Sequence, residues 1–113
     1  MRDNWTARRL YAIEMTAAAA AARTEVRWHH LERAHILSQP FPWLHTRNHI
    51  EMLKAAVRAH DRRESWGQVI RIVVAAPGSW SRRYPAGNTG RVDAGLTTPM
   101  PIPDDLADAL GGR

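Results

Sequence analysis

The stretch WHHLERAHILSQPFPWLHTRNH, residues 28–49, holds five of the six histidines of this 113-residue chain. Two prolines lie in its middle, in Ser38-Gln39-Pro40-Phe41-Pro42. A proline disfavours helix in the residue before it, so the segment around 38–42 predicts a break between two helices. We expect these helices over about residues 25–37 and 43–60, each carrying histidines.

The flanking sequence predicts two more helices. Residues 5–23 contain a run of alanines and no helix breaker. Thr24 is placed to cap the helix that follows them. A fourth helix is expected from about residue 63 to just before Pro77. Its β-branched residues 69–74 would also suit a strand, but a lone strand would have no partner in this chain.

We therefore predict an all-α fold, a compact four-helix domain of two helical hairpins over residues 1–76. Residues 77–113 are rich in glycine and proline and predict an irregular tail packed on the same domain. Within this tail GNTG at 87–90 is interpreted as a turn, and Asp104 or Asp105 could start a last helical turn through Leu110. We expect the five tryptophans to be packing anchors.

Composition excludes several function classes. The chain has no cysteine, so it has neither disulfides nor a thiolate metal site, which favours a cytoplasmic protein. Net charge is +5, but the arginines are scattered, and we expect no nucleic-acid partner. Glu14 interrupts the apolar run near the N-terminus, which argues against a signal peptide. No apolar stretch is long enough to cross a bilayer. No nucleophile motif is present, and no catalytic residue is assigned.

Histidines fall on the predicted inner faces of two helices. Residues of a helix advance by about 100° each, which places His45 and His49 with Ile50, Leu53, Ala56 and Val57. One turn apart, His45 and His49 have the H-x-x-x-H spacing that can chelate one metal ion. In the helix before, His30 lies on the side of Leu31, Ala34 and Leu37, and His35 lies at its edge, three residues after Glu32.

Glu14 lies in the middle of the apolar face predicted for residues 5–23. Burying an unpaired carboxylate costs several kcal/mol, so this position needs a reason. Inward Glu and His on several helices resemble the logic of metal sites in helical bundles. The set suits a mononuclear transition-metal ion (Zn, Fe, Mn, Ni or Cu), with Glu14, Glu32, His35, His45 and His49 as ligands and His30 as an orienting donor.

Each of these residues has an alternative interpretation. Glu14 could form a buried ion pair with an arginine or a protonated histidine of another helix. His45 and His49 could be core-edge imidazoles bonded to backbone or to Glu14. Glu32 and His35 could be a surface pair three residues apart.

Four runs of the sequence resemble a small bacterial family, domain of unknown function 3703. They are HLERAHILSQ at 30–39, HTRNH at 45–49, GNTG at 87–90 and MPIPDDL at 100–106. The likeness covers most of the chain, and Ser38 stands where a glycine is usual. The family has no assigned chemistry, so the resemblance implies none. It does include His30, Glu32, His35, His45 and His49 among its motif positions.

Two functions from different classes follow from these patterns. The first is a metal-binding protein that handles, buffers or senses a transition metal, and a hydrolytic or redox enzyme on the same site stays open. The second is a helical-hairpin interaction module, in which the inward Glu and His form a structural polar network. Its partner would be another protein or a second copy of the chain.

Overall fold

The helices of this protein follow the predicted order. The computed structural model describes the backbone of residues 2–80 and 100–111 and the side chains of residues 4–73 and 100–111. Within these residues there are four long helices and one short helix, with no strand: α1 (Arg2–Ala20), α2 (Thr24–Ser38), α3 (Pro42–Arg58), α4 (Arg62–Trp80) and α5 (Asp104–Ala109). The all-α fold is therefore confirmed.

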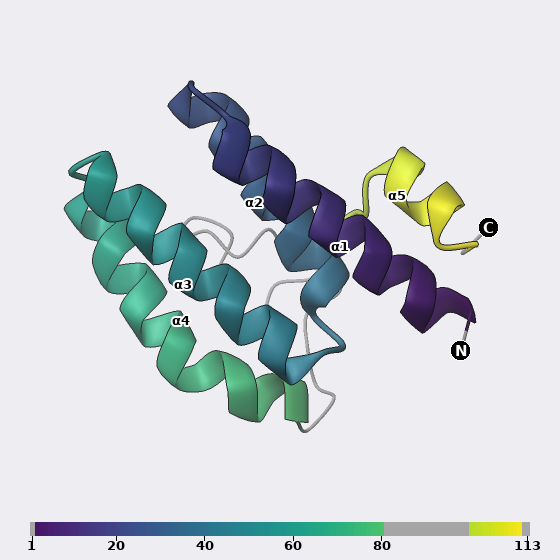
Figure 1. Ribbon diagram of the computed structural model, residues 1–113. Coiled ribbons are helices and arrows are strands. Elements are labelled where there is room, and N and C mark those ends of the chain that lie inside the picture. The colour runs from purple at the N-terminus through teal and green to yellow at the C-terminus, as the bar shows by residue number, and fades with distance from the viewer. Residues whose placement is uncertain (1, 81–99, 112–113) are drawn as a thin grey trace.

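The long helices form two hairpins that pack side by side (Figure 1). In the first, α1 packs along α2, and in the second α3 packs along α4. Contacts between α2 and α3 join the hairpins, while α4 has its extensive contacts with α3. α4 therefore lies at one edge of the helical domain, and the short α5 lies beside α1 at the other (Figure 1).

The turn between α2 and α3 lies at the predicted break. Ser38 is the last residue of α2, and its hydroxyl donates to the carbonyl of His35 at 2.9 Å. The amide of Phe41 donates to the carbonyl of Ser38 at 2.8 Å. Pro42 begins α3, where the missing amide hydrogen costs nothing because a helix leaves its first amides unbonded.

Two predicted helix ends differ from the structure. Thr24 is the first residue of α2 rather than its cap, and Arg23 holds the cap position without a side-chain bond. The expected stop before Pro77 is wrong, because α4 continues to Trp80. A proline inside a helix removes one backbone hydrogen bond, but the residues after it can keep helical dihedral angles.

The apolar core comes from α1, α2, α3 and α5. One cluster consists of Ala18, Trp28, Leu31, Met52, Ala55 and Ala56, and a second consists of Tyr11, Ala34, Ile36, Leu37 and Leu106. Among the described residues of α4, the buried side chains are instead polar, namely Glu64, Gln68 and Arg71. The hairpin of α3 and α4 is thus joined by a polar contact layer.

The predicted inner face of α3 is rotated in the structure. Ile50 and Val57 are 38% and 57% exposed, although the sequence places them toward the core. The buried face consists of His45, Asn48, His49, Met52, Ala55 and Ala56. Three residues of the observed buried face are polar. A prediction that defines the inner face by apolar residues alone therefore places it at the wrong angle around the helix.

The tryptophans also differ from expectation. Trp28 is buried, but Trp5, Trp43 and Trp66 are each about 70% exposed, so these three are not packing anchors of the monomer.

Part of the predicted tail can be compared with the structure. The expected last helical turn is present as α5, whose Leu106 is buried against α1 and α2. The expected GNTG turn lies in residues 81–99, outside the described residues. No helix in the described part of the chain has the length and apolar character that a membrane span requires.

Replacing Leu106 with alanine tests whether α5 contributes to stability. This side chain is only 2% exposed, so Leu106→Ala should lower the free energy of unfolding by about 2–4 kcal/mol. Urea denaturation followed by circular dichroism measures the change. Ile102→Ala is the control, since this side chain is 36% exposed and should cost far less. Equal effects would show that α5 does not hold Leu106 in the core.

Candidate metal centre

Three imidazoles from two helices meet between α2 and α3. His35 lies in the last turn of α2, and His45 and His49 lie one turn apart on α3. The Nε2 atom of His35 is 2.9 Å from that of His45 and 3.1 Å from that of His49. The remaining Nε2 pair, His45 and His49, is 3.2 Å apart. All three rings therefore point the same nitrogen at one point.

This meeting point is in the interior of the protein. His35, His45 and His49 are 3%, 7% and 2% exposed. Among residues whose side chains are described, they form the one group of at least three His, Cys, Asp or Glu side chains close enough to hold a metal ion. The predicted pairing of His45 with His49 is thus extended by His35 from the preceding helix.

A residue of α4 determines which nitrogen of His49 carries the proton. The Nδ1 atom of His49 lies 2.7 Å from Oε1 of Gln68, and Nε2 of Gln68 donates to Oε2 of Glu64 at 2.7 Å. The donation to Glu64 orients the amide, so its oxygen faces His49 and accepts from Nδ1–H. In the neutral ring the Nε2 of His49 then carries a lone pair and no hydrogen.

The three Nε2 contacts cannot all be favourable hydrogen bonds among the rings. A neutral imidazole carries one N–H, so Nε2 either donates or accepts, and the Nε2 of His49 accepts. If His35 and His45 both donate to it, their own two hydrogens face each other. If only one of them donates, two lone pairs face each other instead. A cation bound by all three Nε2 atoms would satisfy all three nitrogens.

Burial keeps His45 and His49 neutral. It lowers the pKa of His45 to about 3, with a further contribution from the neighbouring His49. Burial also lowers the pKa of His49 to about 4; the hydrogen bond that His49 donates to Gln68 opposes this shift, and the charge of Arg71 adds to it. At neutral pH both imidazoles are therefore already in the uncharged form that binds metal ions.

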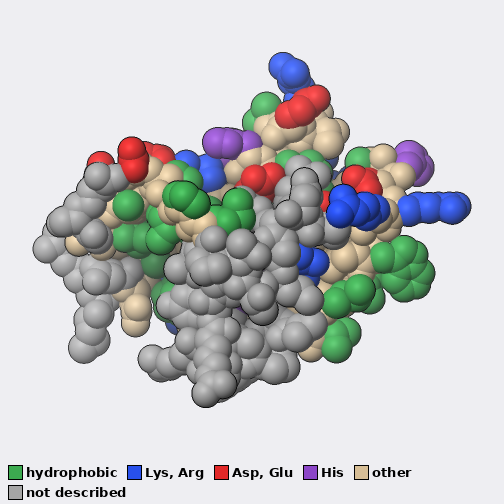
Figure 2. Space-filling view, turned by 180° about the vertical axis from the view of Figure 1, so that it is seen from behind, with side chains coloured by type: hydrophobic (Ala, Val, Ile, Leu, Met, Phe, Trp, Pro, Cys, Tyr) green, Lys and Arg blue, Asp and Glu red, His purple; other side chains and the backbone are tan. Residues whose placement is uncertain are grey.

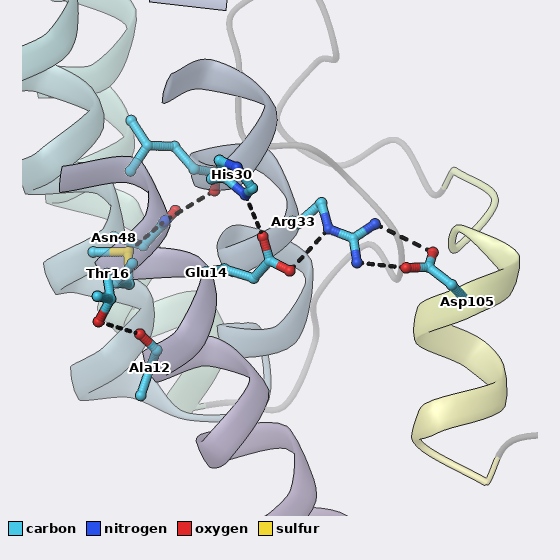
Figure 3. A network of polar contacts seen from close by, with 9 residues as sticks. Ala12, Glu14, Thr16, His30, Arg33, Asn48 and Asp105 are labelled. Carbon is cyan, nitrogen blue, oxygen red and sulfur yellow. Dashed lines mark hydrogen bonds and ion pairs between the residues drawn. The ribbon is translucent and has the colours of Figure 1, made fainter. Parts of the chain in front are cut away.

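Glu14, predicted as a ligand, lies in a different network (Figure 3). The Nδ1–H of His30 donates to its Oε1 at 2.8 Å, and Nε of Arg33 donates to its Oε2 at 3.0 Å. Arg33 also pairs with both carboxylate oxygens of Asp105 on α5, at 2.6 and 3.2 Å. The carboxylate that the sequence placed on an apolar face is thus satisfied by an arginine and a histidine of α2.

The other predicted site residues can be placed as well. Glu32 is not part of the histidine group; it lines a surface pocket with Trp28 and His29. His30 contacts Glu14 rather than any member of the triad. The structure therefore brings together His35, His45 and His49 and leaves Glu14, Glu32 and His30 outside.

Sequence reasoning missed Gln68 as the partner of His49. Gln68 is fully buried and Glu64 is 3% exposed, although both are polar. Their signal is spacing: Glu64, Gln68 and Arg71 recur at intervals of four and three residues, which puts them on one face of α4.

Comparison with known proteins identifies the family. The model of a family described as "Protein of unknown function (DUF3703)" matches residues 6–110. The chain belongs to the DUF3703 family. A search of curated proteins and a search of solved structures gave no match. All three histidines of the triad lie inside the matched region, but the description of the family names no activity.

The lowered pKa values predict how stability changes with pH. Between about pH 6.5 and 4 the unfolded chain takes up protons that folded His45 and His49 do not, so stability is complete above pH 6.5 and falls as the pH decreases. Each group contributes up to about 1.4 kcal/mol per pH unit. Urea denaturation in the presence of a chelator, from pH 7.5 to 4.5, measures this slope.

Variants of single histidines provide the control for this pH effect. His45→Gln should reduce the slope, whereas His29→Gln should leave it unchanged because His29 is exposed. A wild-type slope that His45→Gln does not alter would contradict the buried neutral state of this ring.

Proposed function

We propose that this protein binds one transition-metal ion through the Nε2 atoms of His35, His45 and His49. The observation that carries this proposal is the convergence of three buried Nε2 atoms within 3.2 Å of one another. Without a cation at least one of these contacts is repulsive. With a cation each nitrogen donates its lone pair to a single acceptor.

The spacing of the nitrogens supports a single ion. Imidazole nitrogens bind zinc at about 2.0–2.1 Å, and neighbouring ligands of a tetrahedral or octahedral ion at that distance lie roughly 2.9–3.4 Å apart. The observed 2.9–3.2 Å falls in this range. An ion bound at this distance to nitrogens so close together would lie to one side of the nitrogen plane, with His35, His45 and His49 on the other side.

The donor set favours some metals over others. Three neutral imidazoles suit Zn²⁺, Cu²⁺, Ni²⁺ and Fe²⁺, whereas Mg²⁺, Ca²⁺ and Mn²⁺ prefer oxygen ligands. With Glu14 and Glu32 outside the group, no carboxylate among the described residues belongs to it, and a hard cation would lack an oxygen ligand from them. The proposal therefore narrows the predicted metals to the four that prefer nitrogen.

The surroundings support tight holding of the ion. Because Gln68 accepts the Nδ1 proton of His49, the ligand nitrogen is presented without any tautomer change on binding. The ligands join α2 to α3, so a bound ion would connect the two hairpins of the domain. We infer that the protein retains a metal in the interior, as a storage, buffering or sensing protein does.

Metal binding can be measured directly on protein purified without a histidine tag. Isothermal titration with Zn²⁺, Cu²⁺ or Ni²⁺ should give one ion per chain, and the ion should raise the melting temperature because it binds only the folded state. His49→Ala should lower the affinity at least about a hundredfold, since a three-ligand site becomes a two-ligand site.

A matched histidine outside the triad controls for nonspecific binding. His29 belongs to the same histidine-rich stretch but is exposed and lies outside the triad. His29→Ala should therefore keep the wild-type affinity. Wild-type protein that folds but neither binds nor is stabilised by any of these ions would refute the proposal.

The contribution of Gln68 can be separated from that of the ligands. Gln68→Leu removes the acceptor of the Nδ1 proton of His49, so metal affinity should fall by about 10- to 100-fold without being lost. Ser65→Ala on the same helix should leave the affinity unchanged, since the exposed hydroxyl of Ser65 donates to the carbonyl of Asp61 and not to a histidine of the described triad. An unchanged affinity in Gln68→Leu would show that this bond does not orient the ring.

A further inference from the structure

The polarity of α4 is the reverse of that of an ordinary surface helix. Among the residues of α4 whose side chains are described, the buried ones are Glu64, Gln68 and Arg71, and Gln68 contacts His49 of α3. The exposed side chains of α4 include Trp66, Val69, Ile70 and Val73. A surface helix normally buries its apolar face and leaves the polar face to water. The outer face of α4 therefore has the composition of a buried surface.

These four apolar residues form a continuous stripe. They recur at intervals of three, one and three residues, which places them on one side of α4, centred about 150° around the helix from Gln68. Trp66 is 69% exposed, Ile70 is 53% and Val73 is 73% exposed. Seen from behind, hydrophobic side chains gather along the edge of the molecule where α4 lies (Figure 2). Ile50 and Val57 on the adjacent α3 are also exposed.

We propose that a second copy of this chain covers this stripe, with the two α4 helices packed against each other about a twofold axis. Apolar residues at intervals of three and four are the pattern with which like helices pack side by side in coiled coils. A twofold axis places the same patch on both partners, so the stripe is complementary to itself.

Charge favours an antiparallel arrangement of the two helices. Arg62 and Arg63 lie at the start of α4, and a parallel pair would bring four guanidinium groups together. The sequence has no charged residue at 72–80. In an antiparallel pair the arginines of one copy therefore lie beside uncharged sequence of the other, and Trp66 of one copy faces Val73 of its partner.

The exposed apolar area of the stripe supplies a large part of such an interface. At roughly 150–250 Å² for each large apolar side chain, the four residues together expose on the order of 400 Å². A standard interface buries about 800 Å² on each partner, so the stripe alone supplies about half. It also reaches the size at which an apolar patch on a monomer is unusual.

Two isoleucines of almost equal exposure provide the test. Sedimentation equilibrium of the full-length protein between 1 and ~200 μM should show a monomer–dimer equilibrium. Ile70→Glu places a charge in the stripe and should raise the dissociation constant more than about tenfold. Ile13→Glu is the matched control: Ile13 is 54% exposed on α1, and this variant should dimerise like the wild type.

Single cysteines test the orientation, because the natural chain has none. With the axis between positions 69 and 70, Ile70→Cys lies within disulfide reach of its copy and should cross-link on oxidation. Val73→Cys thiols would be separated by about 10 Å along the helices and should stay reduced. Cross-linking of both variants would indicate a parallel pair and overturn the antiparallel arrangement.

Wild-type protein that remains monomeric at ~200 μM would overturn the proposal. Such a result would leave the stripe to a different protein partner or to residues 81–99 of the same chain. Equal dissociation constants for Ile70→Glu and Ile13→Glu would also overturn it. None of these results depends on metal binding, so this proposal and the function proposed above can fail separately.

Discussion

The approach of three imidazole nitrogens to within about 3 Å inside the protein constrains how the two hairpins pack. His45 and His49 cannot take up a proton easily, because burial and the neighbouring ring lower the pKa of His45, and burial and the charge of Arg71 lower that of His49. The cluster must therefore stay neutral or take up a cation that all three nitrogens can share. Packing of α2 on α3 determines the distances, because His35 comes from one helix and His45 and His49 from the other.

The unusual polarity of α4 follows from this constraint. A buried imidazole has two nitrogens, and when one faces the centre of the triad the other needs a polar partner in the interior. Gln68 provides that partner for His49, and Glu64 in turn accepts from the amide of Gln68. Because these polar side chains occupy the inner face of α4, its large apolar residues lie on the outer face. The candidate metal centre and the proposed dimer surface thus lie on opposite sides of α4.

The order of the helices and the inward direction of His45 and His49 could be predicted from local rules, since prolines interrupt helices and a helix has a fixed period. The faces were predicted less well, because Ile50 and Val57 have the pattern of core residues and yet are exposed. The helical spacing of apolar residues in a sequence does not distinguish a face that packs inside the monomer from a face that packs against another chain. Gln68 could not be assigned to His49 either, because the two belong to different helices and only their packing brings them together.

Glu14 shows why a buried carboxylate near histidines need not be a metal ligand. Its position on an apolar face required a compensating partner, and Arg33 meets that requirement while also binding Asp105 on α5. The hydrogen bonds from Arg33 hold the pKa of Asp105 below its usual range.

With Glu14 engaged between α1 and α2, the triad has only imidazoles, and no carboxylate, as its ligands. A divalent ion bound there would retain its full charge, and Glu64 is the carboxylate connected to the site, through Gln68. The sequence pattern assigned Glu14 and the histidines to one site, but they have different roles in the structure. Glu14, through Arg33, joins α1, α2 and α5, and His35, His45 and His49 form the candidate centre.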